Sequence, residues 1–271
     1  MNAVKPFDEM PVSALSGVHY LLSDIDDTLT DDGVFPADSY RALEDLRAAG
    51  CVVVLITGRP AGWCDMIARF FPVDAVVGEN GALCFYRDGD KVRQIWNDPA
   101  DVRTANLKRL HTIAGDIVGE FEGTALAKDN PWRASDVAVD FAEEVGPLPL
   151  STAEAIRERF EEAGATAKVS SIHVNAWFGS YDKLSMFARW LNEVEGKTVD
   201  AVLAQSVYTG DSPNDVPMFR RFPLSVGVQG IENYHLAPED KPAYVTKSDA
   251  GRGFAEVAKA LLSCFNNNKR D

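Results

Sequence analysis

Hydrophobic and polar positions in the first part of the chain alternate between two patterns. Residues 18–24, 51–58 and 74–80 form short apolar runs, and "CVVVLITG" at 51–58 is typical of a strand buried on both faces of a parallel sheet. Residues 36–50 and 60–71, which lie between these runs, have the pattern of helices. Strands that alternate with helices predict right-handed βαβ units and a doubly wound sheet.

After residue 83 the pattern changes. Residues 81–96 contain two strand-like runs joined by Asp88-Gly89, which is a strong hairpin signal. We expect a long helix, a strand, a second helix and two further strands at roughly 98–121, 136–141, 151–164, 165–171 and 172–178. The second helix is expected to begin with a capping box from Ser151 to Glu154. This grouping predicts an inserted α+β domain over residues 84–179.

The alternating pattern returns after residue 180. A helix, a strand, a second helix, two strands and a last helix are predicted at 182–196, 205–211, 213–222, 224–228, 243–247 and 251–265. The fold class is therefore α/β. A doubly wound, mostly parallel, Rossmann-like core is expected from residues 1–83 and 180–271, and it carries the α+β insertion.

Composition narrows the class of protein further. The 271 residues suffice for one large α/β domain with an insertion, and 46% apolar and 10% aromatic residues are typical of a folded chain. The net charge is −14, with 27 Lys and Arg against 41 Asp and Glu, and no basic stretch occurs. We therefore expect no nucleic-acid partner, no secretory signal and no membrane span. An anionic ligand would need a local cation.

The four cysteines show no metal-binding or redox spacing. Cys51, Cys64, Cys84 and Cys264 form no CxxC pair, and Cys51 and Cys84 lie in apolar, strand-like runs. We expect free thiols in a reducing compartment, which indicates a cytoplasmic protein. No pair of histidines has metal-ligand spacing, so zinc is not expected.

Polar residues that could act in catalysis or binding follow the apolar runs of the predicted core. They are Asp24, Asp26 and Thr28 after the first run, Thr57, Gly58 and Arg59 after the second, and Asp211, Asn214 and Asp215 after a run near the end. Lys183 begins the helix that re-enters the core. Ligands of parallel α/β sheets bind beyond the carboxyl ends of the strands, so we expect these groups to meet at one rim.

The expected cluster has the chemistry of a phosphoryl-transfer site. Asp24 and Asp26 point the same way in an extended chain, and Asp211 from a neighbouring strand adds a further hard oxygen ligand, which suits Mg²⁺. Lys183 and the Thr57 hydroxyl can hold anionic oxygens. With a carboxylate aimed at a bound phosphate, the pocket suits phosphoryl transfer through an aspartyl-phosphate. Asp27, Asp31 and Asp32 are expected to be solvated loop charges.

Four ordered motifs resemble those of the haloacid dehalogenase superfamily of phosphohydrolases. "DIDDT" matches the DxDxT signature, and "ITGR", Lys183 in "YDKLSM", and "GDSPND" match the second, third and fourth motifs. The position of the insertion and "GENGA" resemble the subfamily with a large α/β cap (C2 type). This subfamily includes Cof-type sugar phosphatases and the sucrose-, trehalose- and mannosyl-3-phosphoglycerate phosphatases.

The resemblance implies a role for each motif residue. Asp24 would be the nucleophile, and Asp26 the general acid and base, with its backbone carbonyl on the metal. The implied magnesium ligands or near neighbours of the metal are Asp24, Asp26, Asp211 and Asp215, and Asn214 would lie close to them. The implied phosphate or substrate contacts in the core are Thr57, Gly58, Arg59, Lys183 and Asn214. Thr28 would orient the loop.

The sequence leaves two interpretations open for Arg59 and for several polar residues of the predicted cap. Arg59 either contacts substrate or pairs with an acidic residue of the cap. His173, Asn175 and Trp177 share one face of a predicted strand, and either line a sugar-sized pocket or form a structural face of the cap sheet. The same alternatives apply to Arg133, Asp136 and Asp140, and Trp132 could anchor a loop instead.

The function predicted is a Mg²⁺-dependent phosphatase, a monomer or homodimer, that acts on a small phosphorylated metabolite such as a sugar phosphate. A phosphosugar mutase with the same chemistry is one alternative. From other classes, a phospho-receiver signalling module and a non-catalytic sugar-phosphate binding protein remain. The receiver is disfavoured because its phosphoacceptor lies on a different strand from its acidic pair, and because it needs only about half this length.

Overall fold

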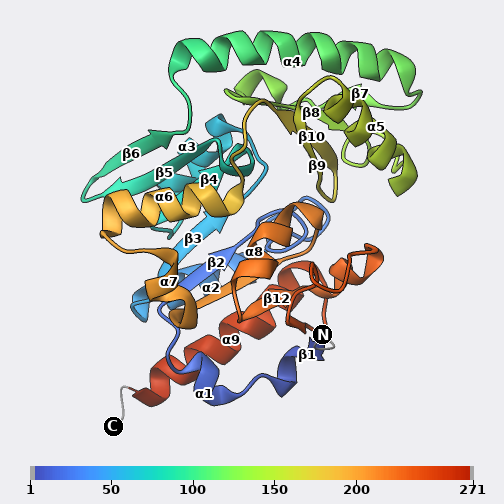
Figure 1. The fold of residues 1–271 in the computed structure, drawn as a ribbon. Coiled ribbons are helices and arrows are strands. Elements are labelled where there is room, and N and C mark those ends of the chain that lie inside the picture. The colour runs from blue at the N-terminus through green and yellow to red at the C-terminus, as the bar shows by residue number, and fades with distance from the viewer. Residues whose placement is uncertain (1–3, 269–271) are drawn as a thin grey trace.

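The structure, a computed structural model, describes residues 4–268 (Figure 1). A large sheet with helices on both faces forms the lower part of the molecule, and a small sheet beneath two helices lies above it. Short 3-10 helices occur at Phe7–Glu9, Glu79–Gly81, Asn130–Trp132, Leu203–Gln205, Pro213–Asp215 and Gln229–Asn233.

The large sheet has nine strands in the order β1-β13-β12-β11-β2-β3-β4-β5-β6. Their bounds are β1 (Lys5–Pro6), β13 (Tyr244–Val245), β12 (Ser225–Gly227), β11 (Ser206–Gly210), β2 (Tyr20–Ser23), β3 (Val52–Ile56), β4 (Ala75–Gly78), β5 (Leu83–Asp88) and β6 (Lys91–Trp96). Neighbours from β1 to β4 in this order are parallel, whereas β5 and β6 pair antiparallel. The predicted fold class, a doubly wound and mostly parallel α/β core, is confirmed.

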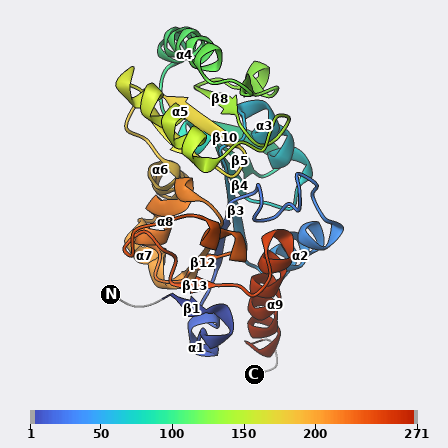
Figure 2. The ribbon, with the colours of Figure 1, turned by 90° about the vertical axis from the view of Figure 1, so that its right-hand side faces the viewer.

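Helices cover both faces of this sheet, as Figure 2 shows. One face packs against α1 (Val12–Leu15), α2 (Ala37–Ala48), α3 (Ala61–Phe70) and α9 (Ala250–Asn268), and the other against α6 (Lys183–Glu195), α7 (Val199–Val202) and α8 (Val216–Arg221). The β-branched residues of β3 show why both faces of the sheet need to be covered. Val53 and Leu55 point into the first layer and Val54 and Ile56 into the second, and all four are fully buried.

The upper sheet has the order β7-β8-β10-β9. Its strands are β7 (Ala125–Leu126), β8 (Asp136–Asp140), β10 (His173–Trp177) and β9 (Thr166–Val169), beneath the helices α4 (Ala100–Glu120) and α5 (Leu150–Glu162). Alternation along β8 and β10 gives the sheet an apolar face and a polar face. Val137, Val139 and Val174 pack with the two helices, whereas Asp136 and Asn175 lie on the opposite face, toward the core. We call the segment from α4 to β10 the cap.

Two expectations about this region are wrong. The hairpin that was predicted to begin the insertion at residue 84 extends the core sheet instead, since β5 pairs with β4. Its residues are apolar on both faces, with Phe85 in one core layer and Cys84 in the other, which is the pattern of a core strand. The capping box at Ser151 is not formed. Helix α5 begins at Leu150 after Pro149, with no side-chain capping bond.

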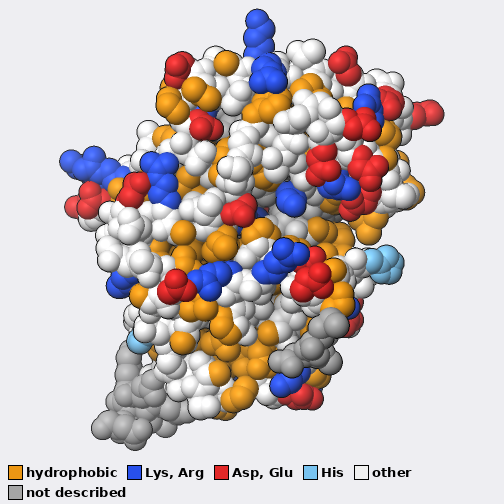
Figure 3. Space-filling view, viewed as in Figure 1, with side chains coloured by type: hydrophobic (Ala, Val, Ile, Leu, Met, Phe, Trp, Pro, Cys, Tyr) orange, Lys and Arg blue, Asp and Glu red, His pale blue; other side chains and the backbone are white. Residues whose placement is uncertain are grey.

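No helix in the described part of the chain is long and apolar enough to cross a membrane. Cys51, Cys64, Cys84 and Cys264 are all free, as predicted, and all four are buried. Figure 3 shows Lys, Arg, Asp and Glu side chains of both signs interspersed on the face toward the viewer.

One glycine is required where the core meets the start of α6. Gly81 has φ +110°, and a Cβ there would lie 2.0 Å from the backbone oxygen of Asp182. Gly81→Ala is expected to lower the free energy of unfolding by about 3 kcal/mol, because both backbone strain and the clash oppose it. Gly115→Ala in α4, where nothing lies within 4 Å, should instead raise it by about 0.5–1 kcal/mol. Urea denaturation measures both, and equal stabilities would contradict this packing.

Candidate active site

Two neighbouring parallel strands bring the acidic motifs together. Asp24 follows β2 and Asp211 follows β11, and the backbone N–H of Asp24 donates to the carbonyl of Thr209 at 2.9 Å. Carboxylate oxygens of Asp24, Asp211 and Asp215 all lie within 4.8 Å of one another. The sheet therefore places residues from opposite ends of the sequence at one rim.

A single ammonium group lies inside this cluster. Lys183, the first residue of α6, is 1% exposed, and its Nζ lies 2.7 Å from Oδ1 of both Asp24 and Asp215. Nζ also donates to Asn214 Oδ1 at 3.2 Å. A capping box between Asp182 and Ser185 fixes the start of the helix, and thereby the position of Lys183.

One lysine does not neutralise the buried carboxylates. Burial raises the pKa of Asp24 to about 7, even though Lys183 opposes the shift. Burial, together with the charges of Asp24 and Asp215, raises the pKa of Asp211 well above its usual range. Excess negative charge on hard oxygen atoms is what a divalent cation such as Mg²⁺ would relieve, so these residues fit that ion.

The members of the cluster differ in how free their oxygens are. Asp211 Oδ1 accepts a hydrogen bond from the Thr28 hydroxyl at 3.2 Å. Asp215 is fully engaged, since its Oδ2 accepts the backbone N–H groups of Asp211 and Ser212, and its Oδ1 accepts from Lys183 and the Tyr208 hydroxyl. Asp215 therefore anchors Lys183 and the loop after β11.

Asp26 lies on the same rim but faces a different partner. Arg59 Nε lies 2.8 and 2.9 Å from the two carboxylate oxygens of Asp26, and Arg59 Nη2 lies 2.7 Å from Oε1 of Glu143 in the cap. The guanidinium carbon lies 4.4 Å from the centre of the Trp63 ring. Of the two interpretations of Arg59, the ion pair with an acidic cap residue is the one present in the structure.

Gly58 and Asn214 line a small cavity with Asp24 and Asp26, and Thr57 directly precedes Gly58 in the chain. The Thr57 hydroxyl is buried and accepts the backbone N–H of Arg59 at 3.0 Å. A Cβ on Gly58 would lie 3.1 Å from Asn80 Nδ2 and 3.3 Å from Asn175 Oδ1, so a side chain at this position would crowd the junction of core and cap. Asn214 Nδ2 donates to Asn80 Oδ1 at 3.3 Å.

The cap is joined to the core by buried polar contacts. Arg133 lies between Asp129 and Asp136, at 2.8 Å from each, and donates to the Gly58 carbonyl at 2.9 Å. The Glu79 carboxylate, at the end of β4, accepts backbone N–H groups from both sides of the junction, namely those of Ala61, Ala134, Ser135 and Asp136. Buried ions with complete sets of partners fix geometry, so these contacts hold the cap in its observed position on the core.

His173, Asn175 and Trp177 share one face of β10, as predicted, but their surroundings differ. His173 and Asn175 line a small cavity together with Asp24, Asp26 and Asn214, and Asn175 donates to Asp136 at 3.1 Å. Trp177 instead stacks on Tyr181, with ring centres 5.7 Å apart. Asp140 accepts the backbone N–H groups of residues 142–144 and shapes the turn after β8, and Trp132 is 56% exposed.

Glu143 was not found by sequence reasoning. It links Arg59 to His173, whose Nε2 lies 2.9 Å from Glu143 Oε2. Burial raises its pKa, but His173 and Arg59 outweigh burial and lower it to about 2. Its neighbour Glu144 has the same side chain and nearly the same sequence context. The sequence alone therefore does not indicate which of the two glutamates faces Arg59 and His173.

The cavity between cap and core is nearly closed. Its volume is about 10 Å³, which is the space of a single water molecule. A sugar phosphate is larger than this space, so its binding would require the cap to move away from the core.

The sequence profile of the haloacid dehalogenase-like hydrolases matches residues 21–111. A comparison with curated protein sequences finds no match. The fold is shared with solved structures over most of the chain. A Thermoplasma acidophilum protein has 19% identity and a TM-score of 0.64, and the alignment covers 90% of this chain and 98% of that one.

Two solved sugar-phosphate phosphatases have the same fold. The C-terminal domain of the trehalose-6-phosphate phosphatase of C. albicans has 14% identity and a TM-score of 0.67, with 97% of this chain and 99% of that one covered. The sucrose-phosphatase of Synechocystis, solved with sucrose and phosphate, has 17% identity and a TM-score of 0.59, with 89% and 97% covered. The profile match and the fold confirm the resemblance to haloacid dehalogenase-like hydrolases that the four motifs predicted.

Glu143→Gln is expected to lower the free energy of unfolding by about 2 kcal/mol at pH 7, because it removes a charge that two buried partners stabilise. The folded-state pKa of about 2 lies below the ordinary 4.5, so this stabilisation is complete above pH 4.5 and is lost as the pH falls toward 2. The difference between wild type and variant in urea denaturation should therefore shrink on acidification.

Glu144→Gln provides the matched control. Glu144 pairs only with Lys128, which is 74% exposed, so solvent screens the pair and the substitution should leave stability nearly unchanged. A Glu143→Gln effect that did not exceed that of Glu144→Gln, or that did not change with pH, would contradict the role given to Glu143.

Proposed function

We propose that this protein is a Mg²⁺-dependent phosphatase that hydrolyses a small phosphorylated metabolite, a sugar phosphate, through an aspartyl-phosphate intermediate. The observation that carries the proposal is the buried contact of Asp24 with Lys183, beside Asp211, beneath a closed cap. Such a pocket offers a carboxylate nucleophile, a fixed cation and hard metal ligands within a few ångströms.

Asp24 is the proposed nucleophile. Lys183 binds its Oδ1, and none of the residues from 4 to 268 donates a hydrogen bond to its Oδ2. One oxygen is thereby held in place while the other is available to the phosphorus atom. Lys183 and the Thr57 hydroxyl are the proposed contacts of the phosphoryl oxygens, where their fixed position stabilises charge that develops in the transition state.

Asp24 and Asp211 are the proposed side-chain ligands of magnesium, with the backbone carbonyl of Asp26, and Asp215 holds their surroundings in place. The ion, when bound, would neutralise these carboxylates and the phosphoryl oxygens. Asp26 is the proposed acid and base, which protonates the leaving alkoxide and then activates water. Its pairing with Arg59, itself held by Glu143, links the position of the acid to closure of the cap.

The cap is the proposed specificity domain, and residues 1–83 and 180–271 with the hairpin 84–96 are the proposed catalytic core. A cap that covers Asp24 excludes bulk water and favours a small substrate over a polymer. The two sugar-phosphate phosphatases with the same fold support the choice of a sugar phosphate.

Asp24→Asn is expected to lower the rate of phosphate release by at least about 1000-fold, because the amide is a poor nucleophile. The assay measures free phosphate from a panel of sugar phosphates with Mg²⁺, which also distinguishes hydrolysis from transfer to another sugar hydroxyl. Asp45→Asn, at an exposed position in α2, is the control and should keep full activity. Undiminished turnover by Asp24→Asn would refute the proposed nucleophile.

Mg²⁺ alone should stabilise the protein against heat. At 100 times its dissociation constant, the ion is expected to add about 2.7 kcal/mol to the free energy of unfolding. Asp211→Asn removes one proposed ligand and should abolish most of this shift, whereas Asp45→Asn should retain it. Differential scanning fluorimetry with increasing Mg²⁺ measures the effect without substrate. The same shift in Asp211→Asn as in the wild type would place the ion elsewhere.

A further inference from the structure

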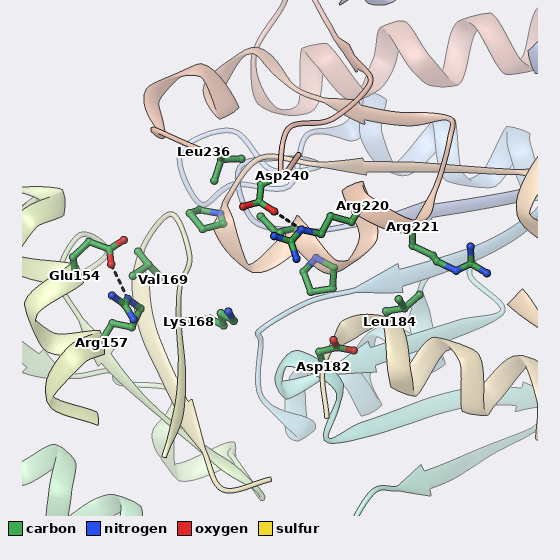
Figure 4. Close-up of a pocket in the computed structure, with 13 residues that line it drawn as sticks. Glu154, Arg157, Lys168, Val169, Asp182, Leu184, Arg220, Arg221, Leu236 and Asp240 are labelled. Atoms are coloured by element: carbon green, nitrogen blue, oxygen red, sulfur yellow. Dashed lines mark hydrogen bonds and ion pairs between the residues drawn. The ribbon is translucent and has the colours of Figure 1, made fainter. Parts of the chain in front are cut away.

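A groove of about 620 Å³ runs between cap and core (Figure 4). The cap side contributes Lys168 and Val169 of β9, and the core side contributes Asp182, Leu184 and Pro213. Its volume lies in the range of sites for small molecules, unlike the closed cavity above Asp24.

The groove adjoins the candidate active site along two segments of the chain. Val169 lines the groove, and the next residue, Ser170, lines the active-site cavity. Pro213 lines the groove between Ser212 and Asn214, which both line the cavity. A molecule with its phosphate at Asp24 would therefore extend into this groove when the cap loosens.

A second hollow, of about 390 Å³, also reaches the site, but its charge is unfavourable. It is lined by acidic residues and a single arginine, namely Asp27, Asp31, Asp32, Asp211, Asp249 and Arg252. In a chain with a net charge of −14, these carboxylates repel a phosphate ester. The groove, in contrast, contains Arg157, Lys168, Arg220 and Arg221.

Lys168 differs from the other cations of the groove. Arg157 pairs with Glu154 at 2.7 Å, Arg220 with Asp240, and Arg221 with Asp200. Within residues 4–268, Lys168 has neither an ion pair nor a side-chain hydrogen bond, although it is half-buried. It lies on the core-facing side of β9, opposite Asn175 in the register, and Figure 4 shows it in the open space between the two walls.

We propose that this groove binds the leaving-group part of the substrate, and that Lys168 pairs with a carboxylate on it. The substrate class is then a phosphate monoester whose alcohol carries a carboxylate. The single unpaired positive charge matches one carboxylate, whereas a second phosphate would bring excess negative charge beside Asp182 and Asp240. This inference rests on the proposed phosphatase activity and names the class of its substrate.

Two esters test the inference, namely 3-phosphoglycerate and glycerol 3-phosphate, which differ only in that the first has a carboxylate where the second has a hydroxymethyl group. The wild type should prefer 3-phosphoglycerate. Lys168→Met should raise KM for 3-phosphoglycerate about 10-fold with little change in kcat. KM for glycerol 3-phosphate should stay within about 2-fold. Lys168→Arg should retain the preference, and Lys108→Met on the exposed side of α4 should behave as wild type.

Hydrolysis of para-nitrophenyl phosphate, measured in parallel, shows whether each variant is folded and active. Equal effects of Lys168→Met on the two esters, or no effect on either, would overturn the inference and leave the phosphatase proposal intact. Absence of phosphate release from every ester by the wild type would overturn the proposed function and this inference with it.

Discussion

The ammonium group of Lys183 lies 2.7 Å from carboxylate oxygens of both Asp24 and Asp215, in a site from which water is almost excluded. This contact joins the end of β2 to the loop after β11 and to α6, the helix that returns from the cap. Without it, the buried carboxylates of the two loops that follow β2 and β11 would face one another uncompensated, at a cost of several kcal/mol. The surrounding structure positions both partners of this contact. Parallel strands place the carboxylates at one rim of the sheet, and the capped start of α6 fixes the position of the lysine.

Pairing of buried charges also explains how the cap is held against the core. Two buried cations at the junction have partners on both sides: Arg133 contacts two aspartates of the cap and the carbonyl of Gly58, and Arg59 contacts Asp26 and Glu143. Arg59 thereby ties Asp26, the proposed acid, to Glu143 of the cap.

Much of this arrangement could be predicted from the sequence, because it depends on short-range patterns and on topology. The continuous apolar run of β3 indicated a buried parallel strand, and the positions of Asp24 and Asp211 after such runs indicated a shared rim. The hairpin 83–96 was assigned to the wrong sheet because its local pattern defines two strands but not their neighbour. Glu143 and Glu79 could not be found, since their importance comes from partners far away in the sequence. The cap face was ambiguous for a similar reason: alternation puts Trp177 beside Asn175, but only Tyr181 decides where its ring packs.

The central claim is that Asp24, held by Lys183, becomes phosphorylated during turnover. Its most direct test is to quench the enzyme during hydrolysis of a phosphate monoester that it releases rapidly, reduce it with borohydride, and identify the altered residue by mass spectrometry. Reduction of an acyl phosphate converts the aspartate to homoserine, and the account predicts this change at Asp24 and only in the presence of substrate. Modification of another residue, or steady phosphate release with Asp24 never altered, would contradict it.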